Sequence, residues 1–381
     1  MAFENATATD FLDLLARVED FATRTRFVHD LAFTGTGPGT FSDGPAAADN
    51  ATVETWTLTV TDDSTPGSEV WSVTGSVSGA AASATTGVAY DNGSISFTIS
   101  GSGYANGDAF TFDVVQGWTA QRSTYDAGTD TDGELILEGV GLGGGEAIVV
   151  GVQSFRDAGN DRYNWRLRGF TSFDGSTWNA LPGASTEVYL PLWSSSIPYW
   201  LIVNEQRLVL MAKVSTIYVH AYLGFVDTYA TDTEHPYPLL VGGSALTDTV
   251  GYSDAASLRA YWADSGLGNP GYLYRPDGAW DQLRQDSTSD VELWPWTLAG
   301  ETWFTHLRDG FGLHPMLPAV LISRPSGTKP RGIFGELDGV YWVSGFGASV
   351  EDTVTVGSQD HVLGQDINRN GRNDHVALEL A

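Results

Sequence analysis

The sequence predicts a mainly β protein with multiple β-sandwich or β-barrel-like domains and a short N-terminal amphipathic helix. Three observations lead to this prediction. Glycine is abundant, at 45 of 381 residues, and turn-forming residues recur at short intervals between apolar stretches, which is typical of many short strands. Several of these stretches alternate polar and apolar residues, as half-buried strands do. A convincing helical period appears only near the N-terminus.

The N-terminal segment, residues 1–33, is expected to be a helix and a docking segment. Apolar residues repeat at helical spacing through residues 7–24, where they would form one face of an amphipathic helix. Thr7 or Thr9 is the expected cap of this helix. The apolar positions are Phe11, Leu14, Leu15, Val18 and Phe21. Such a face must pack against the rest of the chain or against a neighbouring subunit.

Two parts follow this segment. Residues 34–50 are rich in Gly and Pro and are expected to be a linker. Residues 51–117 are expected to form a small β-sandwich module. In that module Thr55–Val60 alternates polar and apolar residues, and Asp91-Asn92-Gly93 is a hairpin turn signal.

The remaining sequence is divided by its aromatic and apolar content. Long apolar strands are expected at 199–203, 207–214 and 217–225. Residues 251–315 are aromatic and polar and show few strand patterns. A short helix is expected within them, at 255–263. The predicted parts are a main β domain at 118–250, an aromatic loop-rich insertion at 251–315, and C-terminal strands at 316–381 that complete the main β domain.

Composition limits the environment and the partners. The chain has no cysteine, which excludes disulfides and thiolate metal sites. The net charge of −28 argues against a nucleic-acid partner, because such proteins need a basic surface. Lysine occurs only at Lys213 and Lys329, and aspartate outnumbers glutamate by about two to one. A strongly acidic, hydrated surface favours solubility in concentrated salt. We therefore expect a halophilic host, with a marine bacterium of acidic proteome as the alternative.

No motif predicts catalysis or membrane insertion. The N-terminus lacks the basic and apolar regions of a secretory signal, and no window of about 18 apolar residues predicts a membrane span. No Gly-x-Ser-x-Gly elbow is present. The seven histidines have no zinc-ligand spacing. We expect no catalytic residues and hence no enzyme.

Aromatic residues crowd the second half of the chain. They are expected on loops, where aromatic side chains form subunit interfaces more often than sugar-binding platforms. Packing in the core is the alternative for several of them. The candidate interface or binding residues are Trp193, Tyr199, Trp200, Tyr229, Tyr237, Tyr272, Tyr274, Trp280, Trp294 and Trp296.

A stretch near the C-terminus has the spacing of a calcium loop. Asp366, Asn368, Asn370 and Asp374 match ligand positions 1, 3, 5 and 9, with a glycine at position 6. The acid required at position 12 is replaced by Ala377. We therefore favour a turn before a final strand. A structural Ca²⁺ or another cation is the alternative, and no other cofactor is expected.

Three runs of residues resemble a known class of protein. They are Q153-S-F-R-D-A-G-N-D-R-Y-N-W-R-L-R-G-F170, L192-W-S-S-S-I-P-Y-W-L-I-V203, and the stretch from Val214 to Ala245. Together they resemble structural proteins in the virions of tailed viruses of bacteria and archaea, usually tail or baseplate components. The module that ends in G101-S-G-Y-A-N-G-D-A-F-T-F-D-V114 resembles small β domains of such virion proteins.

The resemblance implies a structural role in a viral tail or baseplate, in assembly and host attachment. The implied partners are other virion subunits, in a symmetric homo-oligomer, and a host-surface glycan or protein. The chain would be assembled in the host cytoplasm and located in the virion tail. Two alternatives stay open. One is a receptor-binding or glycan-binding tail protein that could also degrade the glycan, and the other is a capsid decoration or turret protein.

Overall fold

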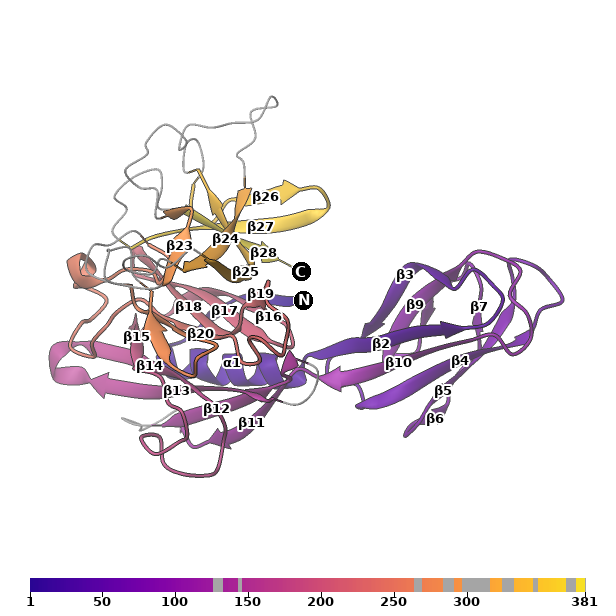
Figure 1. The fold of residues 1–381 in the computed structure, drawn as a ribbon, viewed down its shortest axis with the longest axis horizontal. Coiled ribbons are helices and arrows are strands. Elements are labelled where there is room, and N and C mark those ends of the chain that lie inside the picture. Colours follow the sequence, from indigo (N-terminus) through magenta and orange to yellow (C-terminus); the bar gives the residue numbers. More distant parts are fainter. Residues whose placement is uncertain are drawn as a thin grey trace. The chain divides into compact units, whose positions relative to one another are not determined.

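A computed structural model describes residues 1–125, 133–142, 146–263, 269–283, 291–296, 316–323, 332–344, 349–367 and 375–380. Within these ranges the protein is mainly β, as predicted, and its one α-helix is α1 (Phe11–Arg24). The chain divides into two compact units (Figure 1). The smaller unit is Phe21–Trp118, and the larger unit combines Met1–Asp20 with Thr119–Ala381.

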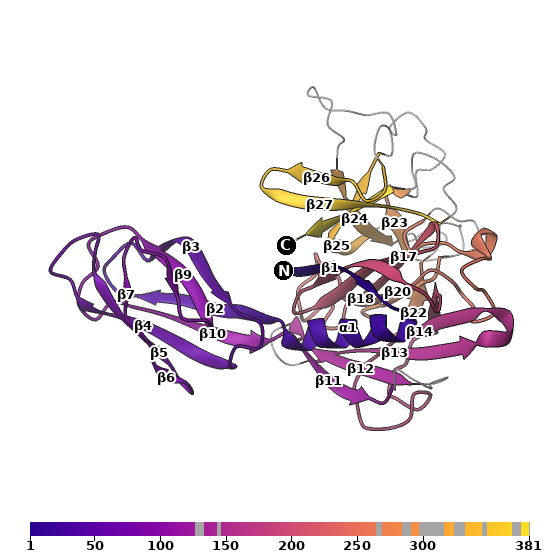
Figure 2. The ribbon, with the colours of Figure 1, turned by 180° about the vertical axis from the view of Figure 1, so that it is seen from behind.

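The smaller unit is a sandwich of two antiparallel sheets (Figure 2). The first sheet contains, in spatial order, β2 (Arg26–Thr34), β10 (Ala109–Gln116), β4 (Glu54–Asp62), β5 (Val70–Gly75) and β6 (Gly79–Ala80), with β7 (Ala84–Thr85) also paired to β5. The second sheet contains β3 (Thr40–Ala47), β9 (Ile95–Ser100) and β8 (Tyr90–Asp91). The chain enters this sandwich through β2 and leaves it through β10, and these two strands pair with each other. The unit is therefore an insertion between two parts of the larger unit.

Alternating residues of the two sheets fill the sandwich core. Trp56, Leu58 and Val60 of β4 are buried, while the residues between them are more exposed. On the same face of this sheet, Phe110 of β10 packs with Trp71 of β5 at 5.5 Å between ring centroids. The period-two pattern of the sequence thus places one face of each strand in the core.

The expected linker at residues 34–50 is wrong, because its central part is strand β3. Phe41 of β3 packs against Phe110 at 4.4 Å and against Phe97 at 5.9 Å. This single large apolar side chain gives a Gly- and Pro-rich segment a place in the core. The sandwich is consequently larger than the predicted 51–117, since β2 and β3 both belong to it.

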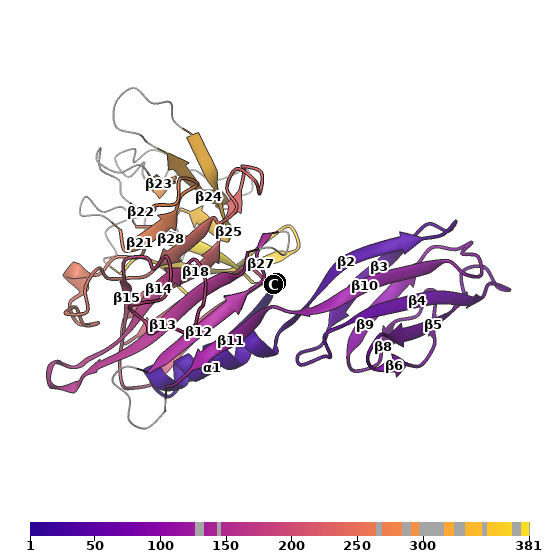
Figure 3. The same cartoon turned by 60° about the horizontal axis from the view of Figure 1, so that its bottom comes forward.

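Three sheets make up the larger unit (Figures 1 and 3). The middle sheet contains β1 (Ala2–Ala8), β16 (Ile197–Val203), β17 (Arg207–Val214), β18 (Ile217–Phe225), β20 (Leu239–Gly242), β21 (Gly271–Tyr274) and β22 (Trp280–Gln282). A second sheet contains β11 (Trp118–Ser123), β12 (Glu134–Gly139), β13 (Ile148–Asp157), β14 (Arg162–Phe170) and β15 (Val188–Leu192). The C-terminal sheet contains β23 (Val291–Trp294), β24 (Met316–Ser323), β25 (Gly332–Val343), β28 (His375–Leu380), β27 (Gln359–Gln365) and β26 (Thr353–Val356), with β19 (Asp227–Thr228) paired to β25.

The middle sheet is covered on both faces. One face packs on the C-terminal sheet through a large cluster that includes Met211, Tyr222 and Trp342. The other face lies toward β13–β15, and Tyr237 O–H donates to the carbonyl of Phe170 at 2.6 Å across this boundary. Burial on both faces explains why β17 and β18 are almost continuously apolar instead of alternating.

Helix α1 confirms the predicted amphipathic helix, with a later start and a different cap. Asp10 Oδ1 accepts hydrogen bonds from the amides of Leu12 at 2.8 Å and Asp13 at 2.9 Å, so Asp10 replaces Thr7 or Thr9 as the cap. The carbonyl of Phe11 accepts a hydrogen bond from Trp165 Nε1 at 3.0 Å. The start of the helix is therefore docked on β14.

Residues 251–315 contain more strand than expected. Within the described part, β21 and β22 extend the middle sheet and β23 joins the C-terminal sheet. The expected helix at 255–263 is only a single 3-10 turn, Ala255–Ser257. Another short 3-10 turn, Ala158–Asn160, links β13 to β14.

Candidate functional site

The structure separates the predicted aromatic residues into core and surface groups. Tyr199, Trp200, Tyr237 and Trp296 are at most 7% exposed and belong to the core. The expected loop position is wrong for four of the residues, because the segments that carry them are strands. These are Tyr272 and Tyr274 in β21, Trp280 in β22, and Trp294 in β23. Tyr199 and Trp200 lie in β16, where a strand at 199–203 was expected.

Two predicted residues lie apart from the others. Trp193 donates from Nε1 to the carbonyl of Ser196 at 3.1 Å and meets Tyr252 edge-to-face at 5.5 Å. Tyr229 is 57% exposed and its hydroxyl donates to Glu336 at 2.8 Å. These contacts fix each ring locally without forming a common site.

Three of the predicted residues meet beside a pocket. Tyr274 packs edge-to-face against Tyr237 at 5.7 Å and against Trp280 at 5.2 Å between ring centroids. The pocket next to them has a volume of about 270 Å³. Its lining residues are Thr171, His235, Pro236, Tyr237, Tyr274, Arg275, Pro276 and Gly278. It is therefore built from the end of β14, the loop before β20, and the β21–β22 hairpin.

The hairpin turn that forms one wall follows from its sequence. Arg275-Pro276-Asp277-Gly278 connects β21 to β22, and the amide of Gly278 donates to the carbonyl of Arg275 at 3.0 Å. Proline suits the second position of such a turn. Gly278 has a φ of +81°, which glycine adopts without strain. The turn places Tyr274, Arg275 and Pro276 together at the pocket.

Arg275 is held by two carboxylates. Its guanidinium pairs with Asp277 at 2.7 Å and with Asp281 at 3.3 Å. Both acids lie within the same hairpin, so these ion pairs hold the arginine against it. The positive charge at the pocket is consequently neutralised before any ligand arrives.

His235 lines the pocket as a neutral ring. It is only 1% exposed, and its Nε2 lies 2.9 Å from the carbonyl oxygen of Tyr274. Burial lowers the pKa of His235, and the bond to the Tyr274 carbonyl opposes this effect only in part. Because a carbonyl oxygen can only accept, Nε2 carries the hydrogen and Nδ1 is an acceptor. Within the described residues, Nδ1 has no hydrogen-bond partner.

Tyr237 fixes the loop that carries His235. Its hydroxyl donates to the Phe170 carbonyl at 2.6 Å and accepts from the amide of Val149 at 3.2 Å. Burial raises the pKa of Tyr237, which keeps the phenol protonated. Only the ring of this residue is therefore offered to the pocket, and its hydroxyl belongs to the scaffold.

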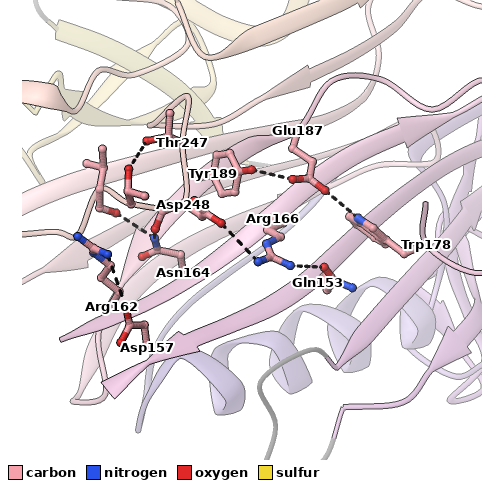
Figure 4. A network of polar contacts seen from close by, with 12 residues as sticks. Gln153, Asp157, Arg162, Asn164, Arg166, Trp178, Glu187, Tyr189, Thr247 and Asp248 are labelled. Carbon is pink, nitrogen blue, oxygen red and sulfur yellow. Dashed lines mark hydrogen bonds and ion pairs between the residues drawn. The ribbon is translucent and has the colours of Figure 1, made fainter. Parts of the chain in front are cut away.

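A polar network covers one face of the neighbouring strands β13–β15 (Figure 4). Arg166 donates to Gln153 at 2.9 Å and lies 3.5 Å from Asp248. Glu187 accepts hydrogen bonds from Trp178 at 3.0 Å and from Tyr189 at 2.7 Å. These residues lie on or beside the predicted run 153–170, and their contacts bind adjacent strands to one another.

Glu187 is the most enclosed acid of this network. Arg168 also lies 3.3 Å from its carboxylate. Burial alone would raise the pKa of Glu187, but the bonds from Tyr189 and Trp178 and the charge of Arg168 outweigh it and lower the pKa. A carboxylate that stays ionised and has three partners is suited to holding strands together.

The predicted cation loop is described only at its first residue. Asp366 is 4% exposed, and its Oδ1 accepts a hydrogen bond from the amide of Ala260 at 2.8 Å. Asn368, Asn370 and Asp374 lie outside the described residues. Within the described ranges, no cluster of three or more His, Asp or Glu side chains could hold a metal ion.

Comparison with known proteins gives no match, either to a protein-family model or to a curated protein sequence. Among the residues that the structure covers, no helix is long and apolar enough to cross a membrane. Sequence reasoning named Tyr237, Tyr274 and Trp280, but it missed His235 and Arg275. The signals that could have drawn attention to them are the proline-rich runs His235-Pro-Tyr-Pro238 and Arg275-Pro-Asp-Gly278.

Proposed function

We propose that this chain is a structural subunit of a tailed-virus virion, in the tail or baseplate, which acts in assembly and host attachment without catalysis. The observation that carries the proposal is the architecture. A three-sheet body contains a separately cored β-sandwich, inserted between α1 and β11. The resemblance of residues 153–170, 192–203 and 214–245 to tail and baseplate proteins supports the same role.

The body is suited to bearing load in an assembly. Its middle sheet is covered on both faces, and buried side chains from that sheet and the C-terminal sheet form one cluster. Interiors packed in this way are dense and deform little. A subunit that transmits force or fixes the positions of neighbours needs this property, and symmetric homo-oligomers are the usual arrangement of such subunits.

The sandwich module is suited to presentation. It has a core of its own that includes Trp56, Trp71 and Phe110. It is joined to the body through β2 and β10, which are paired to each other. An element attached in this way can be added to a body without interrupting the core of that body. The net charge of −28 supports a salt-rich setting, such as the cytoplasm of a halophilic host.

A receptor-binding or glycan-binding tail protein is the second candidate. The pocket formed by Tyr237, Tyr274, His235 and Arg275 favours it, because enclosed sites that combine aromatic and polar residues are typical of small-ligand binding. Hydrolysis assays on purified host polysaccharide would test for an added degrading activity. Release of reducing sugar by the purified chain would overturn the proposal that no catalysis occurs.

Immunogold labelling of intact purified particles tests the location. We expect gold at the tail or baseplate. Labelling confined to the capsid shell would overturn the tail assignment and favour a capsid decoration or turret protein. Absence of the chain from particles, by mass spectrometry of purified virions, would overturn a structural role altogether.

A further inference from the structure

We propose that the pocket between the β21–β22 hairpin and the loop at 235–237 binds one neutral pyranose ring of a glycan. This inference deepens the proposed function, because a role of the pocket in host attachment rests on that function. The binding chemistry itself is argued from the pocket alone. Four features of the pocket, namely its size, its charge, its rings and its buried acceptor, lead to this ligand class.

Size sets the first limit. The pocket volume is about 270 Å³, just below the range of about 300–1,000 Å³ that is typical of sites for drug-sized ligands. A single six-membered ring with its substituents suits this space better than a nucleotide or a long peptide. A glycan could place one ring in the pocket while the rest of its chain continues outside.

The charges at the pocket disfavour anionic ligands and give a cation no free carboxylate. Asp277 and Asp281 already neutralise Arg275, the charged residue of the lining. A carboxylate, sulfate or phosphate would find no unpaired cation there and would meet the field of a chain with a net charge of −28. A cationic ligand would have to take its carboxylates from Arg275. A neutral ligand avoids both conflicts.

The rings provide the apolar contact surface. Tyr274 is half-buried, and Tyr237 and Trp280 hold it from two sides by edge-to-face packing. Such packing fixes the ring orientation at little entropic cost to a later binding step. Pro236 and Pro276 add rigid apolar walls. The C–H face of a pyranose can lie on surfaces of this kind, while its hydroxyls stay at the edges.

The buried acceptor distinguishes a sugar from other neutral ligands. Nδ1 of His235 is a buried acceptor without a partner within the described residues, and a small shift of the ring toward the pocket that it lines would let a ligand donor bond Nδ1 and relieve the cost of burying it. A sugar hydroxyl supplies such a donor. A purely apolar ligand supplies none, and neither does the ring nitrogen of proline in a proline-rich peptide.

Binding can be measured by saturation-transfer NMR and by calorimetry on the full-length chain. The probes are the methyl glycosides of glucose, galactose and mannose, with glucuronic acid as the anionic comparison. We expect at least one neutral glycoside to bind and glucuronic acid to bind more weakly. Tyr274→Ala should weaken binding by about tenfold or more, a change that corresponds to about 1.4 kcal/mol. Tyr252→Ala is the matched control, because Tyr252 contacts Trp193 and Asp161, away from the pocket lining.

His235 gives the second and more specific test. His235→Phe removes the acceptor and should reduce affinity about as much as Tyr274→Ala, while His235→Gln keeps an acceptor and should retain part of the affinity. The inference is overturned if no neutral glycoside binds, if glucuronic acid binds best, or if Tyr252→Ala weakens binding as much as Tyr274→Ala. Labelling of the tail without sugar binding would leave the proposed function standing, and sugar binding by a chain found only on the capsid would leave the site standing.

Discussion

Trp71 and Tyr274, one in each unit, show two different uses of a large aromatic side chain. Trp71, in the smaller unit, is fully buried, with Tyr104 edge-on at 4.9 Å and Phe110 at 5.5 Å. Tyr274, in the larger unit, is also held by two rings but is only half-buried, beside a pocket. In the sandwich the aromatic cluster fills the core, whereas the cluster around Tyr274 leaves part of one ring exposed at a pocket.

Two buried polar groups, one in each unit, give a second contrast. In the sandwich, Asp108 accepts hydrogen bonds from the backbone amides of Thr36, Gly37 and Ala105 at 3.0–3.1 Å. In the larger unit, His235 is equally buried but has an acceptor with no partner within the described residues. The carboxylate of Asp108, which accepts from backbone amides of two loops, holds these loops together. The acceptor of His235 is the group to which the proposed sugar would contribute a donor.

Trp71→Ala is the substitution with the largest expected effect on stability, and it tests this comparison. Truncating a fully buried tryptophan should cost about 3–5 kcal/mol of unfolding free energy, through the cavity it leaves. Because the sandwich has its own core, we expect its denaturation transition to move to lower urea while the transition of the larger unit stays in place. Val77→Ala, at a position that is 72% exposed, is the control and should shift neither transition. One common transition that shifts as a whole would show that the units unfold together.

His220 predicts a pH effect confined to the larger unit. The ring is fully buried against Trp262, and its Nε2 lies 3.2 Å from the carbonyl of Gln365. Burial lowers the pKa of His220 from 6.5 to about 4, although the Gln365 bond opposes it. The unfolded chain therefore takes up a proton at higher pH than the folded chain does. Stability is complete above about pH 6.5 and is lost as the pH falls toward 4, by about 3 kcal/mol in total.

His220→Gln tests this by removing the titration while keeping a donor for Gln365. The variant should be less stable than the natural chain at pH 7, because a packed ring is lost. Its stability should, however, fall less steeply between pH 6.5 and 4, as measured by urea denaturation of the larger unit. An equally steep fall in the variant would assign the acid sensitivity to carboxylates instead.

The sequence predicted a strand correctly where the strand's own residues carried the pattern. It failed where strand formation depends on a partner distant in sequence. Arg207–Val214 and Ile217–Phe225 were predicted with the bounds that the structure has, because their apolar runs end at clear turns. Strand β1 was missed, since its strand character comes from pairing with β16, almost 200 residues later. The strand at 40–47 was missed for the same reason, because its partner is β9.

The site was predictable in composition but not in arrangement. Tyr237, Tyr274 and Trp280 could be named in advance because aromatic residues are enriched at binding surfaces. Their meeting depends on the pairing of β20 with β21 and on the hydrogen bond from Tyr237 to Phe170, and both contacts join segments distant in sequence. Tyr199 and Trp200 have the same composition signal, yet β1 and β17 flank their strand and both side chains are in the core.

Asp108→Ala tests whether a buried carboxylate that accepts backbone hydrogen bonds stabilises the sandwich. Burial alone would raise the pKa of Asp108, but the amides of Ala105, Thr36 and Gly37 outweigh it and lower the pKa. Removing the acceptor from three backbone amides should cost about 2 kcal/mol. The stability that the ionised group provides is present above its ordinary pKa of about 3.8 and is lost as the pH falls through the lower folded value. An unchanged urea midpoint in Asp108→Ala would show that solvent replaces the carboxylate without cost.

Asp366, in the larger unit, is likewise a buried carboxylate that accepts from a backbone amide, and it gives the smallest expected effect. Loss of the hydrogen bond from the Ala260 amide to its Oδ1 in Asp366→Ala should cost about 1 kcal/mol, while Asp366→Asn keeps an acceptor and should cost less. Thermal melts with and without calcium separate this structural role from the calcium-loop interpretation. We expect the same loss in both conditions. If calcium raised the melting temperature of the natural chain but not of Asp366→Ala, the carboxylate would be a cation ligand, and the larger unit would hold a second group left incomplete for a ligand.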